Sequence, residues 1–235
     1  MRTPFFHILS AVPRRVVLAA AALGLAVYVW NDLLKYRFIP KRFGVVEPGL
    51  IYRSGQISKW VIGDVLDRHG IAVVVDLQWP DVADEHHLAE ISATQRRGIV
   101  LERFSLDGDG TGDLERYADA VAAIARAAAQ GRPVLVHCGA GAKRTGGVVA
   151  LYRVLIQGDP SDEAYSELKR YGWRANNPTL PRFLNAHMPQ LAELLVARGV
   201  LKAVPDRLPV IGASETENRR RAPRRADDAG LVDLR

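Results

Sequence analysis

One short segment of the sequence combines residue types that can carry out covalent chemistry. It reads HCGAGAKRTG at residues 137–146, so that Cys138 is followed six positions later by Arg144. The cysteine ends an apolar run, and Thr145 opens a predicted helix. In open α/β sheets, ligands bind at this carboxyl edge of the strands. Residues 137–146 are therefore the candidate site.

The loop after the cysteine has the composition of a phosphate cradle. Its members are Gly139, Ala140, Gly141, Ala142 and Lys143. Small residues at a helix N-terminus let backbone N–H groups point inward, where they bind an anion. The planar fork of Arg144 can hold two phosphate oxygens at once. We predict that this loop and Arg144 bind a phosphate group.

Cys138 is the candidate nucleophile. The positive field of the cradle lowers the pKa of its thiol, which can then be a thiolate near neutral pH. A thiolate beneath a bound phosphoryl group is aligned for attack on phosphorus. Thr145 can donate a hydrogen bond to the sulfur and help it leave in a second step. The alternative is an inert cysteine buried at a strand end.

The leaving group needs a proton, and three aspartates follow neighbouring strands. Asp107 and Asp109 lie in the glycine-rich loop 107–112, and Asp81 lies in Trp79-Pro80-Asp81. Glycine frees the backbone of 107–112, so this loop could carry a carboxylate over the phosphate. For each aspartate the alternative is a solvated turn residue.

The elements that must position these residues alternate between strands and helices. We predict a hairpin over 43–53, strands over 71–77, 99–106 and 133–138, and helices over 58–69, 84–97, 113–129, 145–155, 161–171 and 180–197. Ser58, Asp84, Asp113 and Ser161 are the expected N-caps. This order predicts an α/β fold with a central, mainly parallel sheet flanked by helices on both faces.

His137-Cys138, five residues, Arg144-Thr145-Gly146 resembles the signature of the cysteine-dependent protein tyrosine and dual-specificity phosphatases. Tyr52-Arg53-Ser54-Gly55-Gln56 resembles the opening of their bacterial dual-specificity-like branch. The resemblance covers roughly residues 43–200. It implies a phosphatase-like fold, a phosphocysteine intermediate, and neither a metal nor another cofactor.

The resemblance also implies a general acid about thirty residues before the cysteine. Asp107 and Asp109 precede Cys138 by 31 and 29 residues, whereas Asp81 precedes it by 57. We prefer Asp107 because it directly follows the strand, and we keep Asp109 as the alternative. The Trp-Pro-Asp at 79–81 follows the wrong strand for this family, so we interpret it as a coincidence.

The N-terminal region predicts a membrane anchor. Val16 to Trp30 is an unbroken apolar run, preceded by Arg14 and Arg15 and followed by several basic residues. Such a length at helical rise is close to the thickness of a bilayer core. A cleaved signal peptide and a buried core helix are the alternatives. The short N-terminal tail favours a catalytic domain on the extracytoplasmic side.

The charge is distributed unevenly along the chain. Residues 1–42 carry seven basic residues and one acidic residue, whereas 43–212 carry 19 basic and 20 acidic residues. A nucleic-acid-binding domain should present a basic face, so we expect no nucleic-acid partner. The remaining residues, 213–235, are rich in arginine and poor in bulky apolar residues, which predicts a disordered tail.

The sequence therefore predicts an anchor over 1–42, a catalytic domain over 43–212 and a tail over 213–235. The expected activity is metal-independent hydrolysis of phosphomonoesters, on a phosphoprotein or on an inositol or lipid phosphate. The alternative is a catalytically silent phosphate-binding module at the membrane. Because Cys138 is the only cysteine, the chain has no intramolecular disulfide and no multi-cysteine metal site.

Overall fold

The computed structural model describes residues 13–212. Contacts within the chain divide it into two compact units, Met1–Ile39 and Pro40–Arg235. The first unit holds the predicted anchor and the second holds the candidate site. The predicted disordered tail, 213–235, lies outside the described residues.

The apolar run of the first unit is helical, as predicted. Helix α1 (Arg14–Tyr28) continues into a π-helical turn, η3 (Val29–Leu34), and a short helix, α2 (Lys35–Phe38). No residue of α1 is buried. Arg14–Asn31 is one helical segment in the described range that is long and apolar enough to cross a membrane, and an N-terminal signal sequence would pass the same test.

The second unit is built on a five-stranded sheet with strand order β1-β2-β5-β3-β4. The strands are β1 (Gly44–Glu47), β2 (Ile51–Gly55), β3 (Val73–Asp76), β4 (Val100–Arg103) and β5 (Val134–Cys138). Only the β1–β2 pair of the described strands is antiparallel, and β5 lies in the centre between two parallel neighbours. The predicted mainly parallel sheet is confirmed.

Strand β5 contributes to both cores of this unit, because successive side chains point to opposite faces. Leu135 packs with the apolar residues under one face, whereas Val134, Val136 and Cys138 pack under the other. A strand buried on both faces needs a continuous apolar sequence. That requirement explains why residues 133–138 were recognisable as a strand.

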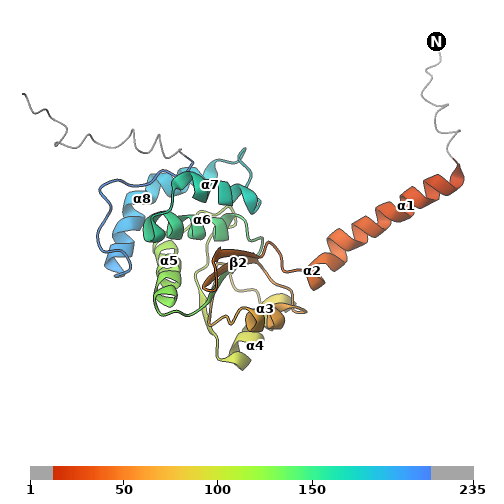
Figure 1. Ribbon diagram of the computed structural model, residues 1–235, viewed down its shortest axis with the longest axis horizontal. Coiled ribbons are helices and arrows are strands. Elements are labelled where there is room, and N and C mark those ends of the chain that lie inside the picture. The colour runs from red at the N-terminus through yellow and green to blue at the C-terminus, as the bar shows by residue number, and fades with distance from the viewer. Residues whose placement is uncertain (1–12, 213–235) are drawn as a thin grey trace, which may run out of the picture. The chain divides into compact units, whose positions relative to one another are not determined.

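Helices cover both faces of the sheet, as predicted (Figure 1). Helices α3 (Ile62–Arg68) and α4 (Glu85–Arg97) lie on one face. The other face carries α5 (Leu114–Ala129), α6 (Lys143–Leu151) with its π-helical continuation η4 (Tyr152–Gln157), α7 (Ser161–Arg170) and α8 (Thr179–Ala197). The larger core, with the alanine-rich side of α5, lies on this second face.

The helix starts predicted at Asp84 and Asp113 are correct, whereas those predicted at Ser58, Ser161 and Thr145 are wrong. The carboxylates of Asp84 and Asp113 accept hydrogen bonds from the first N–H groups of α4 and α5. Ser58 precedes α3 by four residues and does not cap it, and Ser161 is the first residue of α7 with Pro160 at the cap position. Helix α6 begins at Lys143, so Thr145 lies inside it rather than opening it.

Candidate active site

The candidate site lies where the central strand ends. Loop 139–142 connects β5 to α6, and Cys138 is paired in register with Gly55 at the end of β2. On the other side, β3 ends beside His137. The loops that follow β2 and β3 therefore flank the catalytic loop, which places side chains from three strand ends around one point.

The carbonyl groups of the loop are held outward by donors from other segments. Gly139 accepts from the backbone N–H of Gln56 (3.2 Å), Ala140 from Nη1 of Arg42 (2.7 Å) and Gly141 from Nη2 of Arg53 (3.1 Å). Across a trans peptide, a carbonyl and the following N–H point in opposite directions. The N–H groups of residues 140–142 therefore point inward. One of them, Gly141 N–H, lies 3.2 Å from Sγ of Cys138.

Two positions of this loop leave little space for a Cβ. Gly141 has φ +74°, and a Cβ there would lie 2.4 Å from the backbone nitrogen of Gly55. A Cβ on Gly139 would lie 2.8 Å from Oε1 of Gln78. The first contact is with backbone and cannot relax easily, whereas the second is with the end of a flexible side chain. Gly141 is therefore the position where the tight wrap of the loop depends on glycine.

Arg144 crosses from α6 to the end of β3. Its Nη1 donates to the carbonyl of Leu77 at 3.2 Å, and its Nη2 lies 3.6 Å from the position that a Cβ of Gly139 would occupy. The guanidinium is thus held at the edge of the loop and half-buried. An arginine held in this way presents its remaining donors to a bound anion.

The thiol of Cys138 lies in a buried but anion-stabilising environment. Burial raises its pKa, but hydrogen bonds from Thr145, the charge of Arg144 and the N–H of Gly141 lower it, and the net shift is downward. Only 1% of Cys138 is exposed. The hydroxyl of Thr145 also lies within donating distance of the carbonyl of Ser54, at 3.4 Å, so its one proton serves either that carbonyl or the sulfur.

The loop with the candidate acids packs against the first turn of α6. A Cβ on Gly110 would lie 3.1 Å from Cβ of Lys143. The carbonyl of Gly110 accepts a hydrogen bond from the hydroxyl of buried Tyr117 on α5. The loop that carries Asp107 and Asp109 is therefore anchored next to the catalytic helix.

The candidate acids differ in their surroundings. Asp109 accepts hydrogen bonds from the N–H (2.9 Å) and the hydroxyl (2.7 Å) of Thr111, and these bonds lower the pKa of its carboxyl. Asp107 is exposed, and its backbone closes the loop with Thr111 and Gly110. Asp81 is exposed and accepts from the N–H of Ala83 (2.9 Å), in the loop after β3.

A buried ionic network lies directly behind the nucleophile. Nε2 of His137 lies 2.9 Å from Oε1 of Glu90, and Asp76 binds Nε of Arg103 at 2.8 Å. The carboxylates of Glu90 and Asp76 outweigh the effect of burial and raise the pKa of His137 to about 9. Asp76, Glu90 and His137 form a group in residues 13–212 whose ligand atoms are close enough to hold a metal ion. A protonated imidazole beside an arginine favours an ion-pair network over a cation site.

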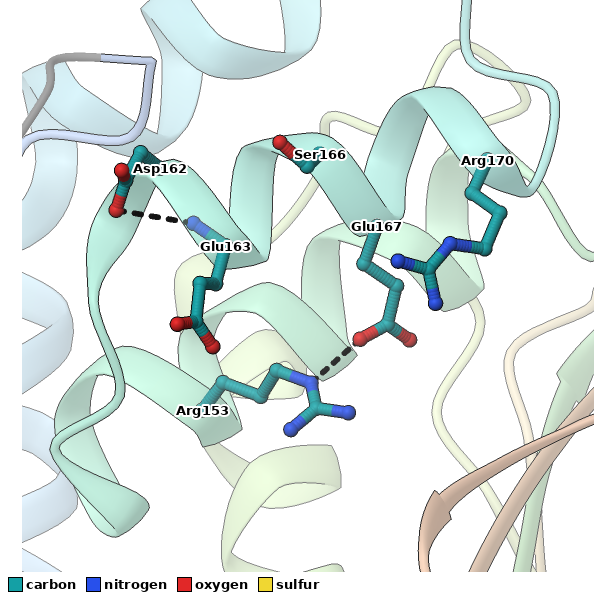
Figure 2. Close-up of a pocket in the computed structure, with 6 residues that line it drawn as sticks. All are labelled: Arg153, Asp162, Glu163, Ser166, Glu167 and Arg170. Carbon is teal, nitrogen blue, oxygen red and sulfur yellow. Dashed lines mark hydrogen bonds and ion pairs between the residues drawn. The ribbon is translucent and has the colours of Figure 1, made fainter.

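Sequence reasoning singled out Arg53 and Gln56 but did not predict the contacts by which residues outside the catalytic loop hold it. Arg53 on β2 is completely buried, and it supports the catalytic loop by donating to the carbonyl of Gly141. Its Nη1 binds Oε1 of Glu167 on α7 at 2.7 Å, and its guanidinium lies 3.9 Å from the ring of Tyr171. The other oxygen of Glu167 binds Nε of Arg153 at 2.5 Å (Figure 2).

These supporting contacts join segments that are far apart in the sequence. Arg42 lies 98 residues before Ala140, and Arg53 lies 114 residues before Glu167. No periodicity or spacing links such pairs. The available signal was an arginine directly after the apolar pair Ile51-Tyr52 of the predicted hairpin, because a charged residue is rarely buried without a partner.

Residues 62–158 match the family described as "Polymorphic toxin system, DSP-PTPase phosphatase". This match includes the whole catalytic loop and the loop with the candidate acids. No curated protein matches this chain.

Solved structures of phosphatases share the fold. The core catalytic domain of PP-IP phosphatase SIW14 from S. cerevisiae is 22% identical, over 60% of this chain and 83% of that chain, with a TM-score of 0.50. P. aeruginosa TpbA is 20% identical over 67% and 96%, with a TM-score of 0.51. PTPMT1 is 16% identical over 67% and 96%, with a TM-score of 0.50.

The matched family and the fold agree with the resemblance carried by residues 137–146. Residues 62–158 thus match a family model of DSP-PTPase phosphatases, and the second unit has the fold of solved phosphatases.

Proposed function

We propose that this chain is a metal-independent phosphomonoesterase that forms a phosphocysteine on Cys138. The observation that carries the proposal is the arrangement of the catalytic loop around Sγ. Three carbonyls are held outward, so the intervening N–H groups face the space above a thiol whose pKa is lowered. This arrangement binds the three terminal oxygens of a phosphate and keeps the nucleophile in line with phosphorus.

The first step transfers the phosphoryl group to sulfur. The thiolate of Cys138 attacks phosphorus, the bond from phosphorus to the leaving oxygen breaks, and Asp107 gives that oxygen its proton. Arg144 and the inward N–H groups stabilise the charge on the equatorial oxygens. The leaving group departs as a neutral alcohol or phenol.

The second step restores the enzyme. Water attacks phosphorus, Asp107 takes the proton of that water, and the P–S bond breaks to give phosphate and the thiolate. The hydroxyl of Thr145 donates to the leaving sulfur, which is supported by its lowering of the thiol pKa. Because its surroundings lower the pKa of the Cys138 thiol, the nucleophile needs no metal to activate it.

Asp107 is the proposed general acid, and Asp109 is the alternative. A general acid should be protonated near the working pH, whereas the contacts of Asp109 with Thr111 lower its pKa. We expect Asp107→Asn to lower kcat at least about a hundredfold and to remove the basic limb of the pH profile. The matched variant Asp109→Asn should have a much smaller effect. A larger loss of kcat in Asp109→Asn than in Asp107→Asn would assign the general acid to Asp109.

The activity is tested with the full chain in detergent micelles, phenyl phosphate as substrate and a chelator present. We expect turnover by the wild type and none by Cys138→Ser. Turnover that persists in Cys138→Ser, or that stops with the chelator, would contradict the mechanism. Vanadate binding without turnover of any phosphomonoester would instead support the silent phosphate-binding module.

The substrate is a phosphorylated molecule, and two similar structures frame the choice. SIW14 is described as a PP-IP phosphatase, and TpbA has been solved with phosphotyrosine. We propose in addition that α1 anchors the enzyme to a membrane, with the catalytic unit on the extracytoplasmic side. Protease treatment of intact cells should then cleave the catalytic unit, and complete protection would reverse the orientation.

A further inference from the structure

A cavity of about 580 Å³ opens beside the catalytic loop, at the start of α6. It is lined by Lys143, Gly172, Arg174, Asn176, Asn177 and Pro178. The lining therefore offers two cations and two amides. None of these described lining residues is a carboxylate, so an anion entering the cavity meets no opposing charge on its walls.

The cavity and the catalytic loop share a border. Lys143 lines the cavity and directly precedes Arg144, so their Cα atoms lie about 3.8 Å apart. The two side chains lie in different places: that of Arg144 reaches the end of β3, whereas that of Lys143 lies beside Gly110 and lines the cavity. Lys143, which the sequence assigned to the phosphate cradle, therefore lies at the border between the catalytic loop and the cavity.

Positive charge continues from the catalytic loop to the cavity. Arg42 donates to the carbonyl of Ala140, and its Nε lies 2.9 Å from the position of a Cβ on Gly172 in the cavity wall. Lys41 lies close enough to Cys138 for the thiolate to act on its pKa, although burial and Arg42 lower that pKa overall. Asp109 is close enough to Lys143 for the ammonium to help lower the pKa of its carboxyl.

One phosphate does not account for this set of cations. The catalytic loop and Arg144 already supply the donors for the transferred phosphoryl group. Lys143 and Arg174, with the amides of Asn176 and Asn177, can bind a further set of phosphate oxygens. We propose that the cavity binds a second phosphate group of the same substrate, and hence that the enzyme favours molecules with two phosphates.

The inference rests on the proposed function, since the first phosphate is the one attacked by Cys138. Two kinds of molecule carry such a second group: a soluble polyol bisphosphate and the headgroup of a phosphorylated lipid. Both present a phosphomonoester near another phosphate. The cavity recognises that shared chemistry, and the experiment separates the two sources.

The test compares three substrates with the full chain in detergent: phenyl phosphate, inositol bisphosphate, and a phosphatidylinositol phosphate in phosphatidylcholine vesicles. We expect Arg174→Gln to lower kcat/KM for a substrate with two phosphates about tenfold more than for phenyl phosphate. Arg170→Gln is the matched control, because Arg170 is exposed on α7 and lines a different cavity (Figure 2). It should leave the ratio of the two kcat/KM values unchanged.

The outcomes identify the source of the phosphate. A selective loss with inositol bisphosphate assigns the cavity to a soluble ligand, and a loss confined to the vesicles assigns it to a lipid headgroup. The proposal would be overturned if Arg174→Gln left kcat/KM for both inositol bisphosphate and the vesicles unchanged relative to that for phenyl phosphate. An equal loss in Arg170→Gln would also overturn it, because that result would reflect general attraction by positive charge.

A binding measurement separates this inference from the proposed function. In the Cys138→Ser background, calorimetry compares inositol bisphosphate with inorganic phosphate. We expect Arg174→Gln to weaken only the former, about tenfold. If the wild type hydrolysed nothing and this weakening were still seen, the proposed function would fail and the second phosphate site would stand. If the wild type hydrolysed phenyl phosphate but Arg174→Gln left the binding of inositol bisphosphate unchanged, the proposed function would stand and the second phosphate site would fail.

Discussion

The reactivity of Cys138 depends on a balance between burial and hydrogen bonding. Burial raises the pKa of the thiol, and Thr145 supplies the largest opposing contribution through its hydroxyl and its backbone. Thr145→Val removes the hydroxyl without a large change in volume. We expect the thiol pKa to rise, so that the acid limb of the kcat/KM profile moves to higher pH by about one unit.

The chain allows this shift to be measured directly. Because Cys138 is the only cysteine, the ultraviolet absorbance of thiolate during a pH titration reports on it alone. The matched control is Thr145→Ser, which keeps the hydroxyl and should keep the wild-type pKa within a few tenths of a unit. Identical titrations for Thr145→Val and the wild type would show that the hydroxyl does not stabilise the thiolate.

The two glycines of the catalytic loop that leave little space for a Cβ, Gly139 and Gly141, should differ in their response to substitution. Gly141→Ala combines a positive φ with a contact to the backbone of Gly55, and we expect a loss of about 2–4 kcal/mol in the free energy of unfolding. Gly139→Ala meets the side chain of Gln78, which can move, so the loss should be about 1 kcal/mol or less. Denaturant titration of the full chain in detergent measures both, and equal losses would contradict this assignment.

At this scale the sequence was most informative where chemistry restricts residue type. Cys138, Arg144 and the small residues between them could be identified because a phosphate cradle needs those types at that spacing. Arg42 and Glu167 could not, because they contact the loop or its support only after distant segments have folded together. The sequence also left Asp107 and Asp109 open, since both lie in one glycine-rich loop.

The ionic network around Glu167 joins helix α7 to the catalytic loop. Arg53 and Arg153 bind the two oxygens of the same carboxylate, but only Arg53 also contacts Gly141. Lysine keeps the charge and loses the planar fork. We expect Arg53→Lys to weaken vanadate binding about tenfold, because the carbonyl of Gly141 is no longer held outward.

Arg153→Lys is the matched control for this prediction. It perturbs the same carboxylate from the opposite side, through a contact of Arg153 with Glu167 that lies outside the catalytic loop (Figure 2). Its vanadate inhibition constant should stay within about twofold of the wild type, even if its unfolding temperature falls. Equal weakening in the two variants would mean that the network acts through general stability alone.

The buried pair of Glu90 and His137 ties helix α4 to strand β5 and should make stability depend on pH. The folded pKa of His137 is about 9, above its ordinary value of 6.5. Protonated His137 therefore contributes its full stabilisation below about pH 6.5, and this contribution is lost as the pH rises towards 9. Its size is on the order of 3 kcal/mol.

Glu90→Gln tests this dependence. The wild type should lose stability between pH 6.5 and 9, whereas the variant should be less stable at pH 6.5 and show a flatter profile. Denaturant titrations of the full chain in detergent at several pH values measure the difference. Parallel profiles for the two proteins would show that the carboxylate does not hold the proton on His137.

The elements themselves were predictable where burial imposes a pattern. The apolar runs at 71–77 and 133–138 gave β3 and β5, and Asp84 and Asp113 gave the starts of α4 and α5. The predicted strand over 99–106 is shorter in the structure, although Phe104 and Leu106 still bond to the backbone at the end of β3. The serine caps failed because the backbone carbonyl of Ser58 accepts in a turn before α3, while Pro160 occupies the cap position of α7.

The whole molecule separates a charged, apolar N-terminal unit from a catalytic unit. The sequence showed this division through the apolar run of α1 and the near-neutral charge of 43–212. It could not show that Arg42, which follows the first unit, contacts the catalytic loop, or that Lys41 contacts the end of β2. The carbonyl of Lys41 accepts from the N–H of Gly55 at 2.7 Å. The segment after the proposed anchor is therefore part of the site's support.

If α1 is a membrane anchor, charges within it should release the enzyme from the membrane. Leu23 and Leu25 are exposed on α1, and an arginine at the centre of a spanning helix costs about 2.5–3.5 kcal/mol. We expect the double variant Leu23→Arg, Leu25→Arg to move from the membrane pellet to the supernatant after alkaline extraction. Its kcat/KM for phenyl phosphate should be unchanged, because the catalytic unit begins at Pro40.

The matched control for the anchor is Val82→Arg, a charge at an exposed apolar residue of the catalytic unit. This variant should stay in the pellet with the wild type. N-terminal sequencing of the mature protein separates the remaining alternative, because a cleaved signal peptide would remove α1 altogether. A wild type that keeps its N-terminus and is nevertheless found in the supernatant would refute the anchor. The phosphatase site would be unaffected by that result, since its described residues lie in the second unit.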